Sequence, residues 1–213
     1  MEKVLIAGAN GKTGTQIVKI LKHRGHYDPV AMIRKEEQRE KFEQMGVTTK
    51  LLDIEDDMSG QFDGISKIIF AAGSGSSTGK EKTIAVDEKG AMSMIDEAKK
   101  SGIKSFVMLS SMGADDPASN GKISHYLEAK HNADEYLKSS NLNYCIVRPG
   151  HLVDEDGTGS IDASPKLNKY GDISRADVAQ VLVLALDHAS ISNKTIEILK
   201  GEKTIEAALA DLH

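Results

Sequence analysis

Short apolar runs alternate with longer amphipathic segments along most of this chain. The first run, residues 3–7, is followed by a segment in which Ile17, Val18 and Leu21 recur at helical spacing, and Gly25 is placed to end that helix. The same alternation continues almost to the last residue. Strands that alternate with helices predict a mostly parallel sheet covered on both faces, because right-handed crossovers place the helices there.

The pattern predicts one doubly wound Rossmann domain of the α/β class over all 213 residues. The expected strands cover residues 3–7, 30–34, 47–53, 67–72, 105–109, 144–148 and 195–199. The expected helices cover the segment up to Gly25, then 36–45, a long stretch to about residue 100, 124–139, 178–186 and a short terminal segment. Two polar segments are interpreted as loops: 73–80, which we expect to be mobile, and 151–173. A small substrate-side region is expected mainly from residues 149–173 and the carboxyl-terminal segment.

A glycine-rich turn separates the first strand from the first helix: Gly8-Ala9-Asn10-Gly11-Lys12-Thr13-Gly14. Such a turn lets backbone N–H groups and the positive end of a helix dipole face a phosphate with no Cβ in between. The end of the turn matches the P-loop of ATPases and GTPases, but the leading glycine of that motif would be Ile6. The three-and-three glycine spacing is instead a variant of the dinucleotide fingerprint. We therefore assign all seven residues of the turn to cofactor binding.

The end of the second strand indicates which dinucleotide is bound. Sites for NAD usually carry an acidic residue there, whereas an arginine suits the 2′-phosphate of NADP. Here the strand ends in Arg34, and Asp28 lies at the wrong end of it. The sequence therefore favours NADP (NADPH), with NAD as the alternative. Arg34 could instead be solvated or paired with Glu36 or Glu37.

Ligands of doubly wound sheets bind beyond the carboxyl ends of the strands. That rule brings the glycine-rich turn together with the residues that follow the later strands. We therefore also assign cofactor binding to Asp53, Ala71, Ala72, Gly73 and Pro149.

A candidate catalytic set lies at the same edge. Tyr126 and Lys130 are four residues apart and so share one face of a helix. A phenol beside an ammonium suits carbonyl reduction, in which the phenol donates a proton and the cation stabilises the phenolate. This pair alone is weak evidence, because lysine is common in the chain. Ser110 and Ser111 end the preceding strand and could donate a hydrogen bond to the same carbonyl oxygen.

The ordered motifs resemble the short-chain dehydrogenase/reductase superfamily, specifically its atypical NAD(P)-binding branch related to biliverdin reductase B, NmrA-like proteins and epimerase/dehydratase-like oxidoreductases. The likeness spans almost the whole chain and rests on 8–14, 52–54, 71–73, 106–111, 126–130 and 146–150. It implies a catalytic serine at Ser111, an acid/base tyrosine at Tyr126, and a lysine at Lys130 that activates the tyrosine and holds the nicotinamide ribose. It also implies an adenine contact at Asp53, with Ile54 beside it.

Two departures from the family pattern limit what the resemblance implies. Many relatives carry a relay asparagine on the central helix, whereas the best match here is Lys89 beside Gly90, so a relay of that kind is not expected. Relatives that act on nucleotide sugars have a larger carboxyl-terminal region than the sixty or so residues after Pro149, which argues against a sugar epimerase.

The favoured hypothesis is an NADPH-dependent oxidoreductase that reduces a small carbonyl-like acceptor. The alternatives are an NADP(H)-binding redox sensor with little or no turnover, which some members of this branch are, and isomerase or dehydratase chemistry with a tightly held cofactor. The substrate is an unidentified small molecule, and a monomer or homodimer is expected.

Composition excludes several other functions. The net charge of −5 offers no bulk attraction for nucleic acid or an anionic membrane, and no run approaches the roughly 20 apolar residues of a membrane span. Cys145 is the only cysteine and falls in an expected buried strand, so a cytoplasmic protein without disulfides is predicted. The seven histidines show no metal-site spacing. His125 and His151 fall beside the expected site and could contact the substrate.

Overall fold

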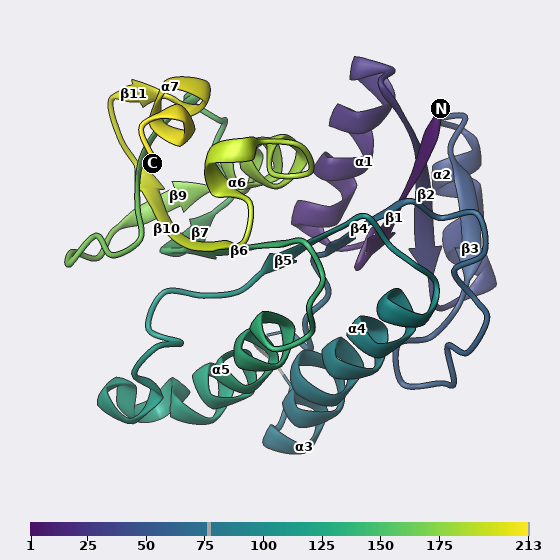
Figure 1. The fold of residues 1–213 in the computed structure, drawn as a ribbon, viewed down its shortest axis with the longest axis horizontal. Helices are drawn as coiled ribbons and strands as arrows, with labels where there is room; N and C mark the ends of the chain where they lie inside the picture. Colours follow the sequence, from purple (N-terminus) through teal and green to yellow (C-terminus); the bar gives the residue numbers. More distant parts are fainter. Residues whose placement is uncertain (76–77, 213) are drawn as a thin grey trace.

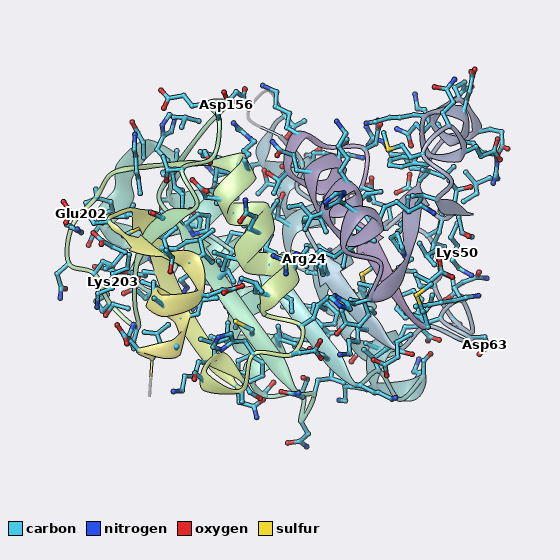
Figure 2. All side chains as sticks on the ribbon, turned by 90° about the horizontal axis from the view of Figure 1, so that it is seen from above. Arg24, Lys50, Asp63, Asp156, Glu202 and Lys203 are labelled. Carbon is cyan, nitrogen blue, oxygen red and sulfur yellow. The ribbon has the colours of Figure 1, made fainter. Side chains whose placement is uncertain are left out.

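The computed structural model describes residues 1–75 and 78–212 and has the predicted α/β architecture. A large sheet crosses the molecule with helices on both of its faces (Figure 1). Helices α1 (Lys12–Arg24) and α6 (Arg175–Leu184) cover one face, and Figure 2 shows them side by side over the strands. Helices α4 (Ala91–Lys100) and α5 (Ser124–Lys138) cover the opposite face (Figure 1).

The sheet has the order β11-β8-β10-β6-β5-β4-β1-β2-β3. Its strands are β1 Glu2–Ala7, β2 Tyr27–Ile33, β3 Thr48–Leu51, β4 Lys67–Phe70, β5 Ser105–Leu109, β6 Tyr144–Pro149, β8 Ser160–Ser164, β10 Lys194–Lys200 and β11 Lys203–Thr204. Neighbours from β10 to β3 in that order are parallel, whereas β8 is antiparallel to both β10 and β11. Because β1 lies between β2 and β4, the chain reverses its winding direction there, and such a reversal opens a crevice for ligands.

The remaining helical segments are short. They are α2 Arg39–Glu43, α3 Lys80–Thr83 and α7 Ile205–Ala210, the 3₁₀ segments η1 Glu36–Gln38, η3 Pro117–Ile123 and η4 Ala189–Ile191, and the π-helical segment η2 Ile84–Gly90.

Two apolar cores hold the layers together. Ile17, Val18 and Leu21 of α1 pack against one face of the sheet, as the helical spacing predicts. Gly25 ends α1 in the left-handed conformation. Met94 and Leu137 belong to the core on the other side. Full burial of each such side chain contributes about 1.5–3 kcal/mol, so the two cores fix the strands whose carboxyl ends carry the candidate site.

Four segments differ from the sequence prediction. The segment 151–173 contains β7 (His151–Val153) and β9 (Asp172–Ser174), which pair with each other, as well as β8. These strands are short and held by pairing between distant segments, which leaves no local period. The helix expected over 36–45 divides into η1 and α2, and the long helix before residue 100 begins as α3 and passes through η2. The mobile loop predicted at 73–80 includes residues 76 and 77, which lie outside the described residues, and Lys80 already belongs to α3.

Candidate functional site

A cavity of about 290 Å³ lies at the carboxyl ends of β1, β2 and β4, where the winding reverses. Nine residues that the sequence assigns to cofactor binding line it: Gly8, Asn10, Gly11, Arg34, Asp53, Ile54, Ala71, Ala72 and Gly73. The remaining lining residues are Met32, Gln38, Leu52, Glu55, Ser74, Lys82 and Val86. Residues from five separate segments of the chain therefore meet around one space.

The glycine-rich turn approaches the neighbouring backbone too closely for side chains. Gly8 has a φ of +80°, and a Cβ there would lie 2.6 Å from the Ala71 oxygen and from the Ala72 nitrogen. A Cβ on Gly14 would collide with the Gly8 carbonyl oxygen. The Gly11 N–H donates to that same oxygen at 2.9 Å, and α1 begins at Lys12. The turn therefore brings bare backbone and a helix N-terminus to the cavity, as a phosphate requires.

We expect Gly14→Ala to destabilise the fold, because the added methyl group meets backbone that cannot rotate away. The expected loss is about 1–3 kcal/mol, together with weaker NADPH binding. Gly79→Ala is the matched control, since Gly79 has an ordinary φ of −77° and a Cβ there meets nothing within 4 Å. Thermal unfolding and NADPH titration of both variants check this. Equal stability of the two would contradict the geometry of the turn.

Six other predicted residues lie outside this cavity lining. Ala9, Thr13 and Gly14 are buried in the turn, and Pro149 is buried at the end of β6. Lys12 is exposed and forms an ion pair with Asp154, which also accepts from Arg175. Lys130 is buried within α5, where it contacts a different set of residues.

Several cavity residues were missed in the sequence because no motif marks them. The Gln38 side-chain oxygen accepts the N–H groups of Arg34 and Lys35 at 3.0 and 3.3 Å and so fixes the bend after β2. Lys82 of α3 forms an ion pair with Glu55 at the cavity lining. Lysine and glutamate are common on surfaces, and only the fold brings these two together.

The alternative in which Arg34 pairs with Glu36 is not realised. The Glu36 carboxylate binds the Arg39 guanidinium instead, with Nη2 and Oε2 separated by 3.1 Å. This hydrogen bond lowers the pKa of Glu36. The Arg34 side chain is exposed at the cavity lining.

The two candidate serines at the end of β5 have different partners. The Ser110 hydroxyl donates to the buried Asp134 carboxylate at 2.8 Å, and Asp134 also accepts from Arg148 at 2.9 Å. Burial raises the pKa of Asp134, although Arg148 opposes the shift. The Ser111 hydroxyl donates at 3.2 Å to the carbonyl of Met112, which is its chain neighbour. Ser110 is thus held in a buried network. The Ser111 hydroxyl makes only this one hydrogen bond within the described residues.

Tyr126 and Lys130 share one face of α5. The Lys130 ammonium lies 5.7 Å from the centroid of the Tyr126 ring, within the range of a cation–π contact, and Tyr126 is partly buried. Lys130 is only 4% exposed, and its Nζ donates to the Leu109 carbonyl of β5 at 3.4 Å. The charge of Lys130 is therefore held next to the phenol and away from water.

No sequence motif marks Asp87, the carboxylate that contacts Lys130. Its Oδ1 lies 2.9 Å from the Lys130 Nζ, and its Oδ2 accepts the N–H of Ser74 at 2.9 Å. Lys89, the residue that best matched the relay asparagine, is exposed. The π-helical turn of η2 adds a residue to the helical repeat, a feature that a sequence pattern cannot show.

Other reactive side chains lie outside this constellation. Burial raises the pKa of the Cys145 thiol to about 12, so it is a core residue rather than a nucleophile. The exposed His151 contacts Asp172 at 3.1 Å. Within residues 1–75 and 78–212, no group of three or more metal-ligating side chains is placed to hold an ion.

The sequence and the fold match proteins with an NAD(P)-binding domain. Residues 8–189 match the model of a family described as NAD(P)H-binding. This chain is an atypical short-chain dehydrogenase/reductase of that family. It therefore has an NAD(P)-binding, oxidoreductase-like fold, and the family's Rossmann architecture accounts for the order of its sheet.

Similar members of the family have about the same length. The uncharacterized sugar epimerase YhfK of Bacillus subtilis is 38% identical, with 99% of this chain and 100% of that protein covered. A solved structure from Bacillus halodurans, whose name places it provisionally among NAD-dependent epimerases/dehydratases, is 41% identical with a TM-score of 0.95 and full coverage of both chains. The oxidoreductase YlbE of Lactococcus lactis is 30% identical with a TM-score of 0.86, over 99% of this chain and 96% of that one.

In the described part of the chain, no helix is long and apolar enough to cross a membrane.

Proposed function

We propose that this protein is an NADP(H)-dependent oxidoreductase that reduces a small carbonyl-like acceptor, with Tyr126 as the proton donor. The observation that carries the proposal is the buried Lys130 ammonium beside the Tyr126 ring. Through Asp87, this ammonium is also connected to Ser74, a residue that lines the cavity. A proton donor and a nucleotide-binding crevice at one sheet edge are the two parts that such a reaction needs.

The residues of the cavity fit a dinucleotide phosphate. Gly8 and Gly11 line the cavity without side chains, and α1 begins directly after them, so backbone of the turn and a helix N-terminus are available to an anion. Arg34 offers an exposed guanidinium at the cavity lining, and the carboxylate of Glu36, one of the two acids that could have paired with it, is paired with Arg39. A free guanidinium at this place favours the 2′-phosphate of NADP over the ribose hydroxyl of NAD. When bound, the reduced cofactor supplies a hydride.

The protein's own groups would manage the proton and the charge on the acceptor oxygen. The Tyr126 hydroxyl donates its proton to that oxygen, and the Lys130 ammonium stabilises the phenolate that remains. Ser111 donates a second hydrogen bond to the oxygen by rotating away from the Met112 carbonyl, which costs one local hydrogen bond. Ser110 is less suited to this role, because its hydroxyl already serves Asp134.

Epimerase names among the relatives do not change this proposal. Sugar epimerases of the extended type carry an additional substrate region, whereas both relatives with such names match this chain over their full lengths. The experiment that tests the proposal is NADPH oxidation by the wild type across carbonyl, quinone, flavin and tetrapyrrole acceptors. Turnover with at least one acceptor class is expected. NADPH binding without any turnover would support the redox-sensor hypothesis instead.

A further inference from the structure

The ammonium of Lys130 is surrounded by four groups. Asp87 faces it from η2, the Leu109 carbonyl from β5, and Tyr126 and Asp134 from its own helix. The Asp134 carboxylate already forms an ion pair with the Arg148 guanidinium, with Oδ2 and Nη2 separated by 2.9 Å. Asp87 is therefore the counter-ion that Lys130 depends on.

Asp87 itself is fully buried at 0% exposure, in an unusual stretch of backbone. Its segment, η2, is π-helical, and such turns occur frequently at functional sites. Burial of a carboxylate is costly unless it is paired, and an apolar pair of similar size would often be equally stable. The fold alone therefore gives little reason for an ion pair between η2 and α5.

The second oxygen of Asp87 connects the pair to the cavity. It accepts the N–H of Ser74, a residue of the cavity lining, and the Ser74 hydroxyl lies 3.2 Å from the Thr83 hydroxyl. One carboxylate thus bridges the wall of the nucleotide cavity and the lysine beside the candidate proton donor.

We propose that Asp87 is a positioning residue of this site, whose carboxylate keeps the Lys130 ammonium charged and fixed beside Tyr126 while anchoring it to the cavity wall at Ser74. The inference rests on the proposed function for its catalytic meaning. Burial alone lowers the pKa of Lys130, but Tyr126 and Asp87 together raise it above the ordinary lysine value. Without Asp87, one of the two interactions that oppose the effect of burial is lost, and the amine would lose its proton more easily.

The test follows the protonation of Lys130 directly by NMR of lysine labelled at Cε and Nζ. The Lys130 signal is assigned by its absence in Lys130→Met. In the wild type, Lys130 should stay charged above the ordinary lysine pKa of about 10.4. In Asp87→Asn, which keeps an acceptor for the Ser74 N–H, its midpoint should fall by about one to three pH units. Glu97→Gln is the matched control, because Glu97 is a buried carboxylate of α4 that accepts the Gly60 N–H at 2.8 Å and does not contact Lys130.

A functional readout accompanies the titration. The fall of the reduction rate at alkaline pH should begin at lower pH in Asp87→Asn than in the wild type and in Glu97→Gln, because the charge on Lys130 is lost sooner. An unchanged Lys130 midpoint in Asp87→Asn would overturn the inference. So would a wild-type Lys130 that titrates at or below the ordinary value, a result that does not depend on the folding of Asp87→Asn. Absence of turnover in the wild type would defeat the proposed function, whereas the titration would still decide the role of Asp87.

Discussion

Tyr126→Phe is expected to lower the rate of carbonyl reduction by about 10²–10⁴-fold, because it removes the only atom that distinguishes the two side chains, the donating hydroxyl oxygen. NADPH binding should be almost unchanged, since Tyr126 does not line the cavity of the glycine-rich turn. The rate is measured from the loss of NADPH absorbance with an acceptor that the wild type reduces, and binding is measured from NADPH fluorescence.

Tyr136→Phe provides the matched control for that measurement. Tyr136 lies on the same helix, but its hydroxyl donates to the Asp96 carboxylate of α4 at 2.8 Å. This variant should retain the wild-type rate. Equal rates for wild type and Tyr126→Phe would exclude Tyr126 as the proton donor, whereas equal losses in the two variants would indicate a general effect on the helix.

Arg34→Asp is expected to weaken NADPH binding by about tenfold to a hundredfold while leaving NADH binding unchanged or improved. A hydrogen bond to a charged group contributes about 1.5–3 kcal/mol, and each 1.4 kcal/mol is a factor of ten in affinity. The new carboxylate would also repel a 2′-phosphate and accept from a ribose hydroxyl. Titration of both cofactors into both proteins, at one salt concentration, measures the change in preference.

Arg24→Asp is the control for the charge reversal. Arg24, labelled in Figure 2, is exposed and ends α1, at the opposite end of the helix from the glycine-rich turn, and it is not among the residues that line the cavity. It has the same effect on net charge as Arg34→Asp and should leave the ratio of NADPH to NADH affinity unchanged. Equal affinities of the wild type for the two cofactors would contradict the NADP preference.

Most of the fold was predictable from the sequence because local signals agree with the tertiary structure. The apolar stripe of α1 and its terminal Gly25 predict this helix from residues that are close in the sequence. The short strands β7, β8 and β9 lacked such signals, since β7 pairs with β9, and β8 pairs with the distant β10 and with β11. The shortened α2 likewise depends on the bend that Gln38 stabilises.

The candidate site was predictable only in part, and the reason is chemical. Residues recruited through their backbone, such as Gly8 and Gly73, are visible as motifs at strand ends. Asp87 is not, because its importance arises from a single contact with Lys130, forty-three positions later, and from a π-turn that shifts the helical face. Lys89, the residue that best matched the relay asparagine, is exposed, and no relay was expected from it.

The most direct measurement is transfer of deuterium from NADPH, with both nicotinamide C4 hydrogens replaced by deuterium, to the carbonyl and tetrapyrrole acceptors, which take up hydride at carbon. Flavin and quinone acceptors are left out of this panel, because deuterium delivered to nitrogen or oxygen exchanges with water. Wild-type protein, the labelled NADPH and the panel of acceptors are incubated together, and the masses of the products are measured by mass spectrometry. We expect one deuterium in the reduced form of at least one acceptor, and none above background with Tyr126→Phe. NADPH that binds tightly while no acceptor gains deuterium would contradict an oxidoreductase and favour a redox sensor.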